Sequence, residues 1–170
     1  CDLTADKLGL DTSEVVVCST GVIGVQLPMS AIEEGIPQAV ESLSGNGGGN
    51  AAAAIMTTDT VSKTFAVEVM VGGAKVRIGG MAKGSGMIAP NMATMLSVIT
   101  TDADVAPELL CELLSEATRR SFNCITVDGD MSTNDTVIVL ANGASDAAVI
   151  EDQGDAVECF YAGLEMVCRE

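Results

Sequence analysis

The sequence predicts a mixed α/β sandwich in which helices are layered on a sheet. Two observations predict it. Short β-branched runs typical of strands follow stretches with helical apolar periodicity, and one pair of alternating runs is separated by two glycines. No internal repeat is found. With 170 residues, 48% of them hydrophobic, the chain fits one domain with a substantial core.

The first third is expected to contain one strand and one helix. Residues 15–18 are a β-branched run closed by Ser19, Thr20 and Gly21, which predicts a buried strand that ends in a loop. Pro28 marks the start of a helix expected to reach Leu43. Residues 44–50 include four glycines, which are costly to order, so a mobile surface loop is expected there.

The middle of the chain predicts a β-hairpin. Apolar residues alternate from Phe65 to Val71 and again from Val76 to Ile78, with Gly72 and Gly73 between the two runs. Residues 81–93 have no period and are rich in Gly, Met, Ala and Pro, which indicates an ordered loop. A strand is expected to follow over residues 95–100.

The last third predicts two helices and two strands. Between residues 104 and 122 the apolar positions fall on one helical face, with a proline near the start and two arginines at the end. Residues 124–127 and 136–140 are expected to be strands on either side of an acidic loop. Residues 156–167 have the apolar stripe of a final amphipathic helix.

Composition excludes several classes of function. Eight basic residues against 24 acidic ones give a net charge of -16, which would repel nucleic acid and an anionic membrane surface. The apolar runs are too short for the roughly 20 residues that span a bilayer, so a soluble protein is expected. Six cysteines without a CxxC pair indicate reduced, mostly buried thiols in a cytoplasmic protein, with a disulfide framework as the alternative. Both ends have the character of cut ends, since no initiator Met or signal-like segment is present at Cys1.

The absence of histidine restricts the chemistry within this chain. A Ser-His-Asp triad, a Cys-His pair and a mixed zinc site are excluded, so a nucleophile would need lysine, a carboxylate or a free α-amine as its base. The glycines around Lys83 do not form a phosphate loop, because Lys83 precedes the Gly-Ser pair. The acidic loop from Asp128 lacks the Gly and Glu of a calcium-binding EF-hand, which favours a turn held by side-chain hydrogen bonds.

Thr94 has the most suggestive local setting of any hydroxyl in the chain. It stands at the head of an apolar strand, after a Gly- and Pro-containing loop that could expose it while the strand holds it rigidly. A threonine before a strand is also simply a residue that favours β structure. The setting alone therefore leaves both interpretations open.

Five stretches in the same order closely resemble the ornithine acetyltransferase family. They are STGVIG at residues 19–24, IMTTDT at 55–60, GGMAKGSGMIAPNMATML at 79–96, TDA at 101–103 and ITVDGDMSTNDTVIVLAN at 125–142. Together they cover most of the chain from about Val15. The resemblance implies an ornithine acetyltransferase-like α/β fold, incomplete here because family members are more than twice as long.

The resemblance also implies self-cleavage of the Ala93/Thr94 bond. Residues 1–93 would then be the C-terminal portion of an α chain, and residues 94–170 the N-terminal portion of a β chain. Thr94, as a new N-terminus, would carry acetyl from N2-acetylornithine to glutamate. Its α-amine, titrating at about 7.7–8.0, could act as the base that histidine does not supply.

The same resemblance implies roles for further residues. Thr20 and Gly21 would form the oxyanion hole, worth roughly 3 kcal/mol per donor, and Thr57 and Lys83 would bind substrate together with Thr94. No cofactor or metal is implied, although acetyl-CoA is a co-substrate in some relatives. The expected assembly has two α and two β chains.

Simpler interpretations remain for each of these positions. Thr20 and Gly21 could form a plain turn, Thr57 could be a helix-end hydroxyl, and Lys83 could be a solvated charge. Two alternative functions also stay open. One is an amidase or aminopeptidase that shares the N-terminal nucleophile, and the other is an inactive fragment that only associates with other chains.

Overall fold

The computed structural model describes residues 1–151 and 153–170, with only the backbone of Met92 and Ala93. The chain divides into two units, residues 1–51 and 52–170, which are described one at a time. This division differs from the predicted covalent division at residues 93 and 94, which stays a prediction.

The first unit is helical. It contains α1 (Asp2–Leu8), the short 3-10 helix η1 (Thr12–Glu14) and α2 (Met29–Glu41), and α3 (Gly48–Ala54) begins at its end. The predicted helix from Pro28 is confirmed in α2. The predicted strand over residues 15–18 is wrong, since these residues have no regular structure; an apolar run becomes a strand only where a partner strand pairs with it. The predicted loop over residues 44–50 is wrong in its second half, because the alanines that follow, strong helix formers, extend α3 back over residues 48–50.

The second unit is built on a mixed sheet with strand order β1-β2-β5-β6. Its strands are β1 (Lys63–Val71), β2 (Ala74–Lys83), β5 (Leu96–Thr101) and β6 (Thr136–Ala141). The predicted hairpin is confirmed in β1 and β2, and its turn places Gly72 and Gly73 at φ of 57° and 87°. Strand β5 pairs antiparallel with β2 and parallel with β6, and the connection between β5 and β6 contains a helix.

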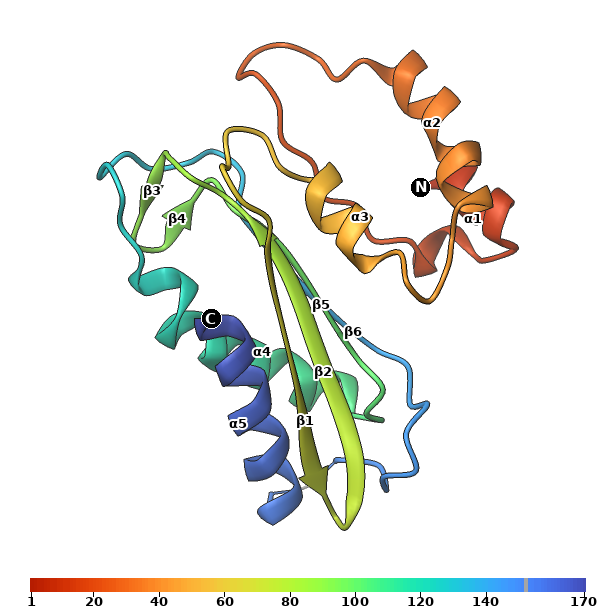
Figure 1. Ribbon diagram of the computed structural model, residues 1–170, viewed down its shortest axis with the longest axis vertical. Coiled ribbons are helices and arrows are strands. Elements are labelled where there is room, and N and C mark those ends of the chain that lie inside the picture. The colour runs from red at the N-terminus through yellow and green to blue at the C-terminus, as the bar shows by residue number, and fades with distance from the viewer. Residues whose placement is uncertain (152) are drawn as a thin grey trace. The chain divides into compact units, whose positions relative to one another are not determined.

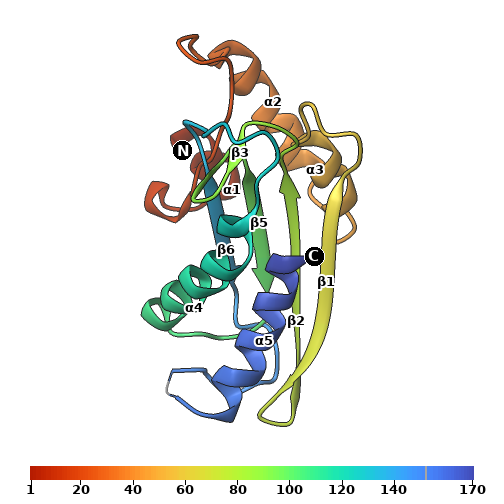
Figure 2. The ribbon, with the colours of Figure 1, turned by 90° about the vertical axis from the view of Figure 1, so that its left-hand side faces the viewer.

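Two helices, α4 (Pro107–Arg120) and α5 (Asp155–Arg169), cover one face of this sheet (Figures 1 and 2). Both were predicted. In α5, Gly163 allows a close approach to the sheet, because a Cβ there would lie 2.9 Å from Val69 Cγ1. Fully burying a side chain such as Ile78 or Phe160 stabilises the fold by roughly 1.5–3 kcal/mol. The most deeply buried apolar residues of this core are Val71, Val76, Ile78, Ile99, Ala103, Ala117, Ile150, Phe160 and Leu164. The mixed α/β class predicted from the sequence is confirmed.

Two predictions on either side of this sheet need correction. Residues 81–93 are not one loop, because β2 continues to Lys83 and a small hairpin of β3 (Ile88–Ala89) and β4 (Met92–Ala93) follows. Residues 124–127 are not a strand. Their first residue ends the 3-10 helix η2 (Phe122–Cys124), and Val127 makes a single backbone bond, to Ile88, rather than a ladder.

The cysteines are more exposed than expected. None of the six forms a disulfide in the described residues, and only Cys168 is buried. Cys111 and Cys159 are exposed on α4 and α5 rather than packed in the core. Burial raises the pKa of the Cys168 thiol to about 11.

Within the described part of the chain, every helix is too short or too polar to cross a membrane. The same residues contain no group of three or more His, Cys, Asp or Glu side chains placed to hold a metal ion.

Candidate active site

Thr94 follows the small hairpin formed by β3 and β4, at the end of the sheet where β2 ends and β5 begins (Figure 1). Residues 88–89 pair with residues 92–93, and Asn91 in the turn has φ of 66°. Strand β5 begins two residues after Thr94, at Leu96. The predicted nucleophile therefore lies between a two-residue strand and a long strand of the main sheet.

Both hydrogen-bond donors of Thr94 converge on one carbonyl. The Thr94 hydroxyl Oγ1 and the Thr94 amide each donate to the Met87 carbonyl oxygen, at 2.9 Å in both cases. Met87 itself has φ of 56°, a left-handed conformation that a residue with a side chain rarely adopts. The Thr94 side chain is half-buried. Its orientation is thus fixed by the carbonyl of Met87, a residue whose backbone has an unusual conformation.

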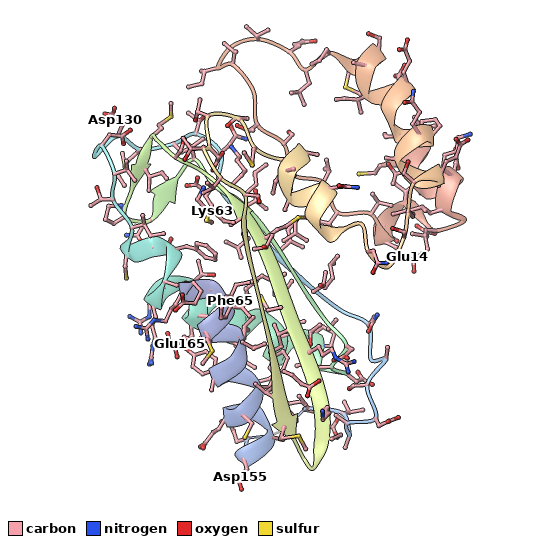
Figure 3. The ribbon with its side chains drawn as sticks, viewed as in Figure 1. Glu14, Lys63, Phe65, Asp130, Asp155 and Glu165 are labelled. Atoms are coloured by element: carbon pink, nitrogen blue, oxygen red, sulfur yellow. The ribbon has the colours of Figure 1, made fainter. Side chains whose placement is uncertain are left out.

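The carboxylate of Asp128 holds this backbone. Asp128 Oδ2 accepts from the Met87 amide at 2.6 Å, and Asp128 Oδ1 accepts from the Ile88 amide at 3.0 Å. These two bonds lower the pKa of Asp128, the Met87 bond contributing more. The segment continues as the acidic loop that was expected to be a turn, and Asp130 in this loop is labelled in Figure 3.

Asp135, at the other end of the acidic loop, holds the residue after Thr94. Its Oδ1 accepts from the Met95 amide at 3.3 Å. Burial raises the pKa of Asp135, while the Met95 amide, the Ser132 hydroxyl and the charge of Lys83 act in the opposite direction. The acidic loop therefore contacts the backbone on both sides of Thr94.

A third carboxylate, Asp59, joins the two segments expected to bind substrate. Its side chain is 0% exposed, and its Oδ1 accepts from Lys63 Nζ at 2.5 Å and from the Gly84 amide at 2.8 Å. Its Oδ2 accepts from the Thr57 amide at 3.3 Å. Burial alone would raise the pKa of Asp59, but these hydrogen bonds, with the Lys63 bond the strongest, lower it to about 2. Lys63 is labelled at the start of β1 in Figure 3.

Lys83 and Thr57 lie next to the groups that Asp59 holds. Lys83 is the last residue of β2, immediately before Gly84, and only 2% of it is exposed. The interpretation of Lys83 as a solvated surface charge is therefore wrong, because its side chain is buried. Thr57 lies beyond α3 and is exposed. The two segments are joined a second time by the hydroxyls of Thr58 and Ser85, which lie 2.6 Å apart.

Gly84 connects these segments to Thr94. It has φ of 151°, and a Cβ on Gly84 would lie 3.0 Å from the Thr94 carbonyl oxygen. Only a glycine allows the backbone after Lys83 to pass this close to Thr94. The structure thus brings three of the predicted segments together, those that contain Thr57, Lys83 and Thr94.

Thr20 and Gly21 belong to the first unit, and their placement against Thr94 stays a prediction. They precede a turn closed by a bond from the Val25 amide to the Val22 carbonyl at 3.0 Å. A Cβ on Gly21 would lie 3.3 Å from Leu27 Cδ2, so the backbone is closely packed at this point.

The whole chain, residues 1–170, matches the model of the family described as the ArgJ family. The chain belongs to the ArgJ family. It is 54% identical over 165 residues to the arginine biosynthesis bifunctional protein ArgJ of a Synechococcus species. This alignment covers 97% of the present chain and 40% of the Synechococcus protein. The chain is 60% identical over 141 residues to the protein of the same name from Symbiobacterium thermophilum, covering 83% of this chain and 35% of that protein. The chain therefore spans about 40% of the length of its ArgJ relatives.

The sequence does not identify Asp59, Asp128 and Asp135 as parts of the site. All three stand inside stretches that carry the family resemblance, so the available signal was an acidic residue beside each predicted functional segment. Some of their bonds are local, such as that from Lys63 to Asp59. The bonds that reach the surroundings of Thr94, from Gly84, Met87, Ile88 and Met95, span 25 to 41 residues, beyond the reach of any local pattern.

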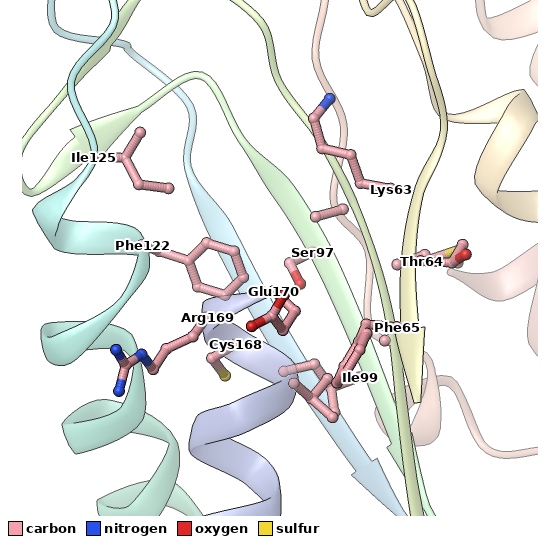
Figure 4. Close-up of a pocket in the computed structure, with 14 residues that line it drawn as sticks. Lys63, Thr64, Phe65, Ser97, Ile99, Phe122, Ile125, Cys168, Arg169 and Glu170 are labelled. Atoms are coloured by element: carbon pink, nitrogen blue, oxygen red, sulfur yellow. The ribbon is translucent and has the colours of Figure 1, made fainter. Parts of the chain in front are cut away.

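An apolar pocket of the second unit borders the contacts of Asp59. It has a volume of about 120 Å³ and lies between the sheet and the end of α5, where Phe65, Ile99 and Phe122 line it (Figure 4). Lys63, the partner of Asp59, also lines it. None of the site residues predicted from the sequence is among its lining residues.

Proposed function

We propose that the full-length protein, in the cytoplasm, cleaves its own Ala93/Thr94 bond and then transfers acetyl from N2-acetylornithine to glutamate through an acetyl-Thr94 intermediate. The observation that carries the proposal is the convergence of the Thr94 hydroxyl and amide on the Met87 carbonyl. It fixes the nucleophile and the nitrogen of the bond to be cut in one place. Membership of the ArgJ family and the names of its arginine-biosynthesis relatives support the reaction class.

Self-cleavage would proceed by an acyl shift. Thr94 Oγ1 attacks the Ala93 carbonyl carbon, the bond from that carbon to the Thr94 nitrogen breaks, and the nitrogen takes up a proton. The product is an ester, which water hydrolyses to the Ala93 carboxylate and the free Thr94 hydroxyl. The freed α-amine titrates at about 7.7–8.0, against about 10.4 for lysine, so an unprotonated fraction that can accept a proton is present near neutral pH.

Acetyl transfer would use the same atoms. The α-amine of Thr94 removes the proton from Oγ1 as this oxygen attacks the acetyl carbonyl, and it returns the proton to the amine of ornithine as that amine leaves. The α-amine of glutamate then attacks the acetyl carbonyl carbon, and the bond from that carbon to Thr94 Oγ1 breaks. The Thr94 α-amine takes the proton that the glutamate amine loses and gives a proton to Oγ1, which leaves N-acetylglutamate and the free hydroxyl. The expected oxyanion hole of Thr20 and Gly21 would stabilise both tetrahedral intermediates, and the buried charge of Lys83 would bind a substrate carboxylate.

The two chains would stay together after cleavage. Strand β2 lies before the cut and β5 after it, and they pair over six positions from Ile78 with Thr101 to Lys83 with Leu96. Backbone hydrogen bonds and the core below them would hold the α and β portions in one sheet. An assembly of two α and two β chains is the expected form.

The test is mass spectrometry and assay of the full-length precursor with Thr94→Ala and Thr94→Ser. The wild type should yield two chains that separate at Ala93/Thr94, and Thr94→Ala should stay uncut and inactive. Thr94→Ser keeps a hydroxyl and should be cut, which makes it the matched control. A wild-type precursor that stays uncut would overturn the proposal.

The acceptor is identified by assaying N2-acetylornithine with and without glutamate. Formation of N-acetylglutamate supports the transferase, whereas acetate release that is independent of glutamate indicates an amidase. The relatives are named bifunctional, so acetyl-CoA with glutamate is the second assay. Transfer from acetyl-CoA would make it a co-substrate of this protein as well.

A further inference from the structure

We infer that Asp128 is a positioning residue for self-cleavage, which aligns Thr94 by holding the backbone of Met87. This inference rests on the proposed function of Thr94. It gives a role to the acidic loop, whose sequence does not fit the pattern of an EF-hand calcium site.

Three hydrogen bonds join the acidic loop to the hairpin. Each oxygen of the Asp128 carboxylate accepts one backbone N–H from the base of the hairpin, Oδ2 from Met87 at 2.6 Å and Oδ1 from Ile88 at 3.0 Å. The Val127 amide donates to the Ile88 carbonyl at 2.9 Å. Hydrogen bonds to a charged acceptor are about twice as strong as neutral ones. These three hydrogen bonds thus fix the backbone of two consecutive residues, Met87 and Ile88, at the start of β3.

The hydrogen bonds from Asp128 determine the direction of the Met87 carbonyl. Met87 has φ of 56°, and without an external constraint a methionine favours negative φ. A change to negative φ would turn the Met87 carbonyl away from Thr94 and remove the partner of both Thr94 donors. A carbonyl oxygen has two lone pairs and so accepts the hydroxyl and the amide together. Asp128 therefore acts on Thr94 through one intervening residue.

The surrounding backbone leaves little room for another arrangement. A Cβ on Gly86 would lie 3.3 Å from Asp128 Oδ2, and one on Gly84 would lie 3.0 Å from the Thr94 carbonyl oxygen. On the far side of Thr94, the Met95 amide donates to Asp135 and the Met95 carbonyl accepts from the Thr136 amide at 3.0 Å. The acidic loop thus fixes the positions before and after the nucleophile.

Asp128 is exposed and lies outside the apolar core, so its loss should leave the fold intact. Asp130 offers a matched control in the same loop. Its backbone amide donates to Asp128 Oδ1 at 3.3 Å, a bond that a change of the Asp130 side chain leaves in place. Asp128→Asn and Asp130→Asn therefore remove the same charge from the same loop, but only Asp128→Asn removes an acceptor of the hairpin.

The experiment follows cleavage of the full-length precursor over time, with and without hydroxylamine. Hydroxylamine cuts an ester to give the hydroxamate of Ala93 and the free Thr94 hydroxyl, but it leaves an amide intact on this timescale. Asp128→Asn should slow cleavage at least tenfold without rescue by hydroxylamine, because misalignment prevents the ester from forming. Asp130→Asn should cleave at the wild-type rate, and both melting midpoints should match that of the wild type.

A second variant tests the route through Met87. Glycine adopts positive φ readily, so Met87→Gly combined with Asp128→Asn should cleave faster than Asp128→Asn alone. This comparison remains valid if Asp128→Asn lowers the melting midpoint, since a general loss of structure would not be repaired by a glycine at residue 87.

Three results would overturn the inference. They are equal cleavage rates in Asp128→Asn and Asp130→Asn, restoration of cleavage by hydroxylamine, and no gain from Met87→Gly. If the wild type is cut and any of these results is found, only the role of Asp128 fails. An uncut wild type would overturn the proposed function and this inference together.

Discussion

The four-stranded sheet and the hairpin that precedes Thr94 are held by different forces. The sheet is stabilised by apolar side chains between its strands and two helices, with Ile78 and Phe160 both 0% exposed. The hairpin has strands of two residues, and the carboxylate of Asp128, which accepts from the amides of Met87 and Ile88 at its base, holds it in place. Apolar packing is non-directional, whereas a hydrogen bond fixes one atom against another. The comparison indicates that apolar packing around the sheet provides most of the stability of this unit, whereas hydrogen bonds to carboxylates set the geometry of the site.

The largest expected effect on stability comes from Phe160→Ala in the sheet's core. Removing a fully buried phenylalanine should lower the free energy of unfolding by about 3–5 kcal/mol. Denaturant unfolding of the full-length Thr94→Ala precursor, which stays a single chain, measures this effect. At temperatures where the variant remains folded, cleavage in a Thr94 background should proceed at nearly the wild-type rate. A large loss of cleavage in the folded variant would show that the two regions are not separate. Phe160→Leu, which refills most of the volume, is the control.

Asp59→Asn should have the next largest effect, because Asp59 belongs to both regions. Its carboxylate is buried and accepts from Lys63 at the start of β1 and from Gly84 beside Thr94. An amide can satisfy these donors only in part, and an unsatisfied buried donor costs about 1–3 kcal/mol. Glu68→Gln, which removes an exposed acid paired with Lys75, is the control. Equal unfolding free energies for the two variants would contradict the role given to Asp59.

The effect of Asp59 should also depend on pH. Its pKa in the folded state is about 2, below the ordinary 3.8. The unfolded chain therefore binds the proton first as pH falls, so the stabilisation is complete above about pH 4 and is lost toward pH 2. Unfolding curves between pH 2 and 6 should show a steeper acid loss in the wild type than in Asp59→Asn. Parallel curves would mean that Asp59 contributes no pH-dependent stability.

The contrast between the two regions also explains what the sequence could predict. The alternation from Phe65 to Ile78 around two glycines is a local pattern, and the structure confirms the hairpin that it predicts. The run at residues 15–18 has the same local character but no pairing strand, so it forms no strand. The positive φ of Met87 depends on Asp128, 41 residues away, and no local pattern contains that information. The family resemblance is what makes Thr94 the predicted nucleophile, while the orientation of its side chain comes from the structure.

Gly84→Ala should affect cleavage more than stability. Alanine disfavours φ of 151°, and its Cβ would lie 3.0 Å from the Thr94 carbonyl oxygen, so the backbone around the cut must shift. We expect a loss of roughly 1 kcal/mol in unfolding free energy and at least a tenfold slower cleavage. Gly35→Ala is the matched control, since a Cβ there meets no atom within 4 Å and Gly35 lies inside α2. Cleavage of Gly84→Ala at the rate of Gly35→Ala would show that Gly84 does not constrain Thr94.

The smallest effect is expected from Glu116→Gln, a carboxylate that resembles Asp59 in pKa but not in surroundings. Hydrogen bonds from Arg119 and then Arg120 lower the pKa of Glu116 to about 2, and all three side chains are at least 36% exposed. Water screens such pairs, and holding long side chains in one geometry offsets much of the attraction. We therefore expect unfolding curves at pH 7 that overlap those of the wild type, and unchanged cleavage.

Because Asp59 and Glu116 share a pKa of about 2, a difference in the stability of their amide variants would isolate the effect of burial and backbone contact. A destabilisation by Glu116→Gln as large as that by Asp59→Asn would refute that distinction.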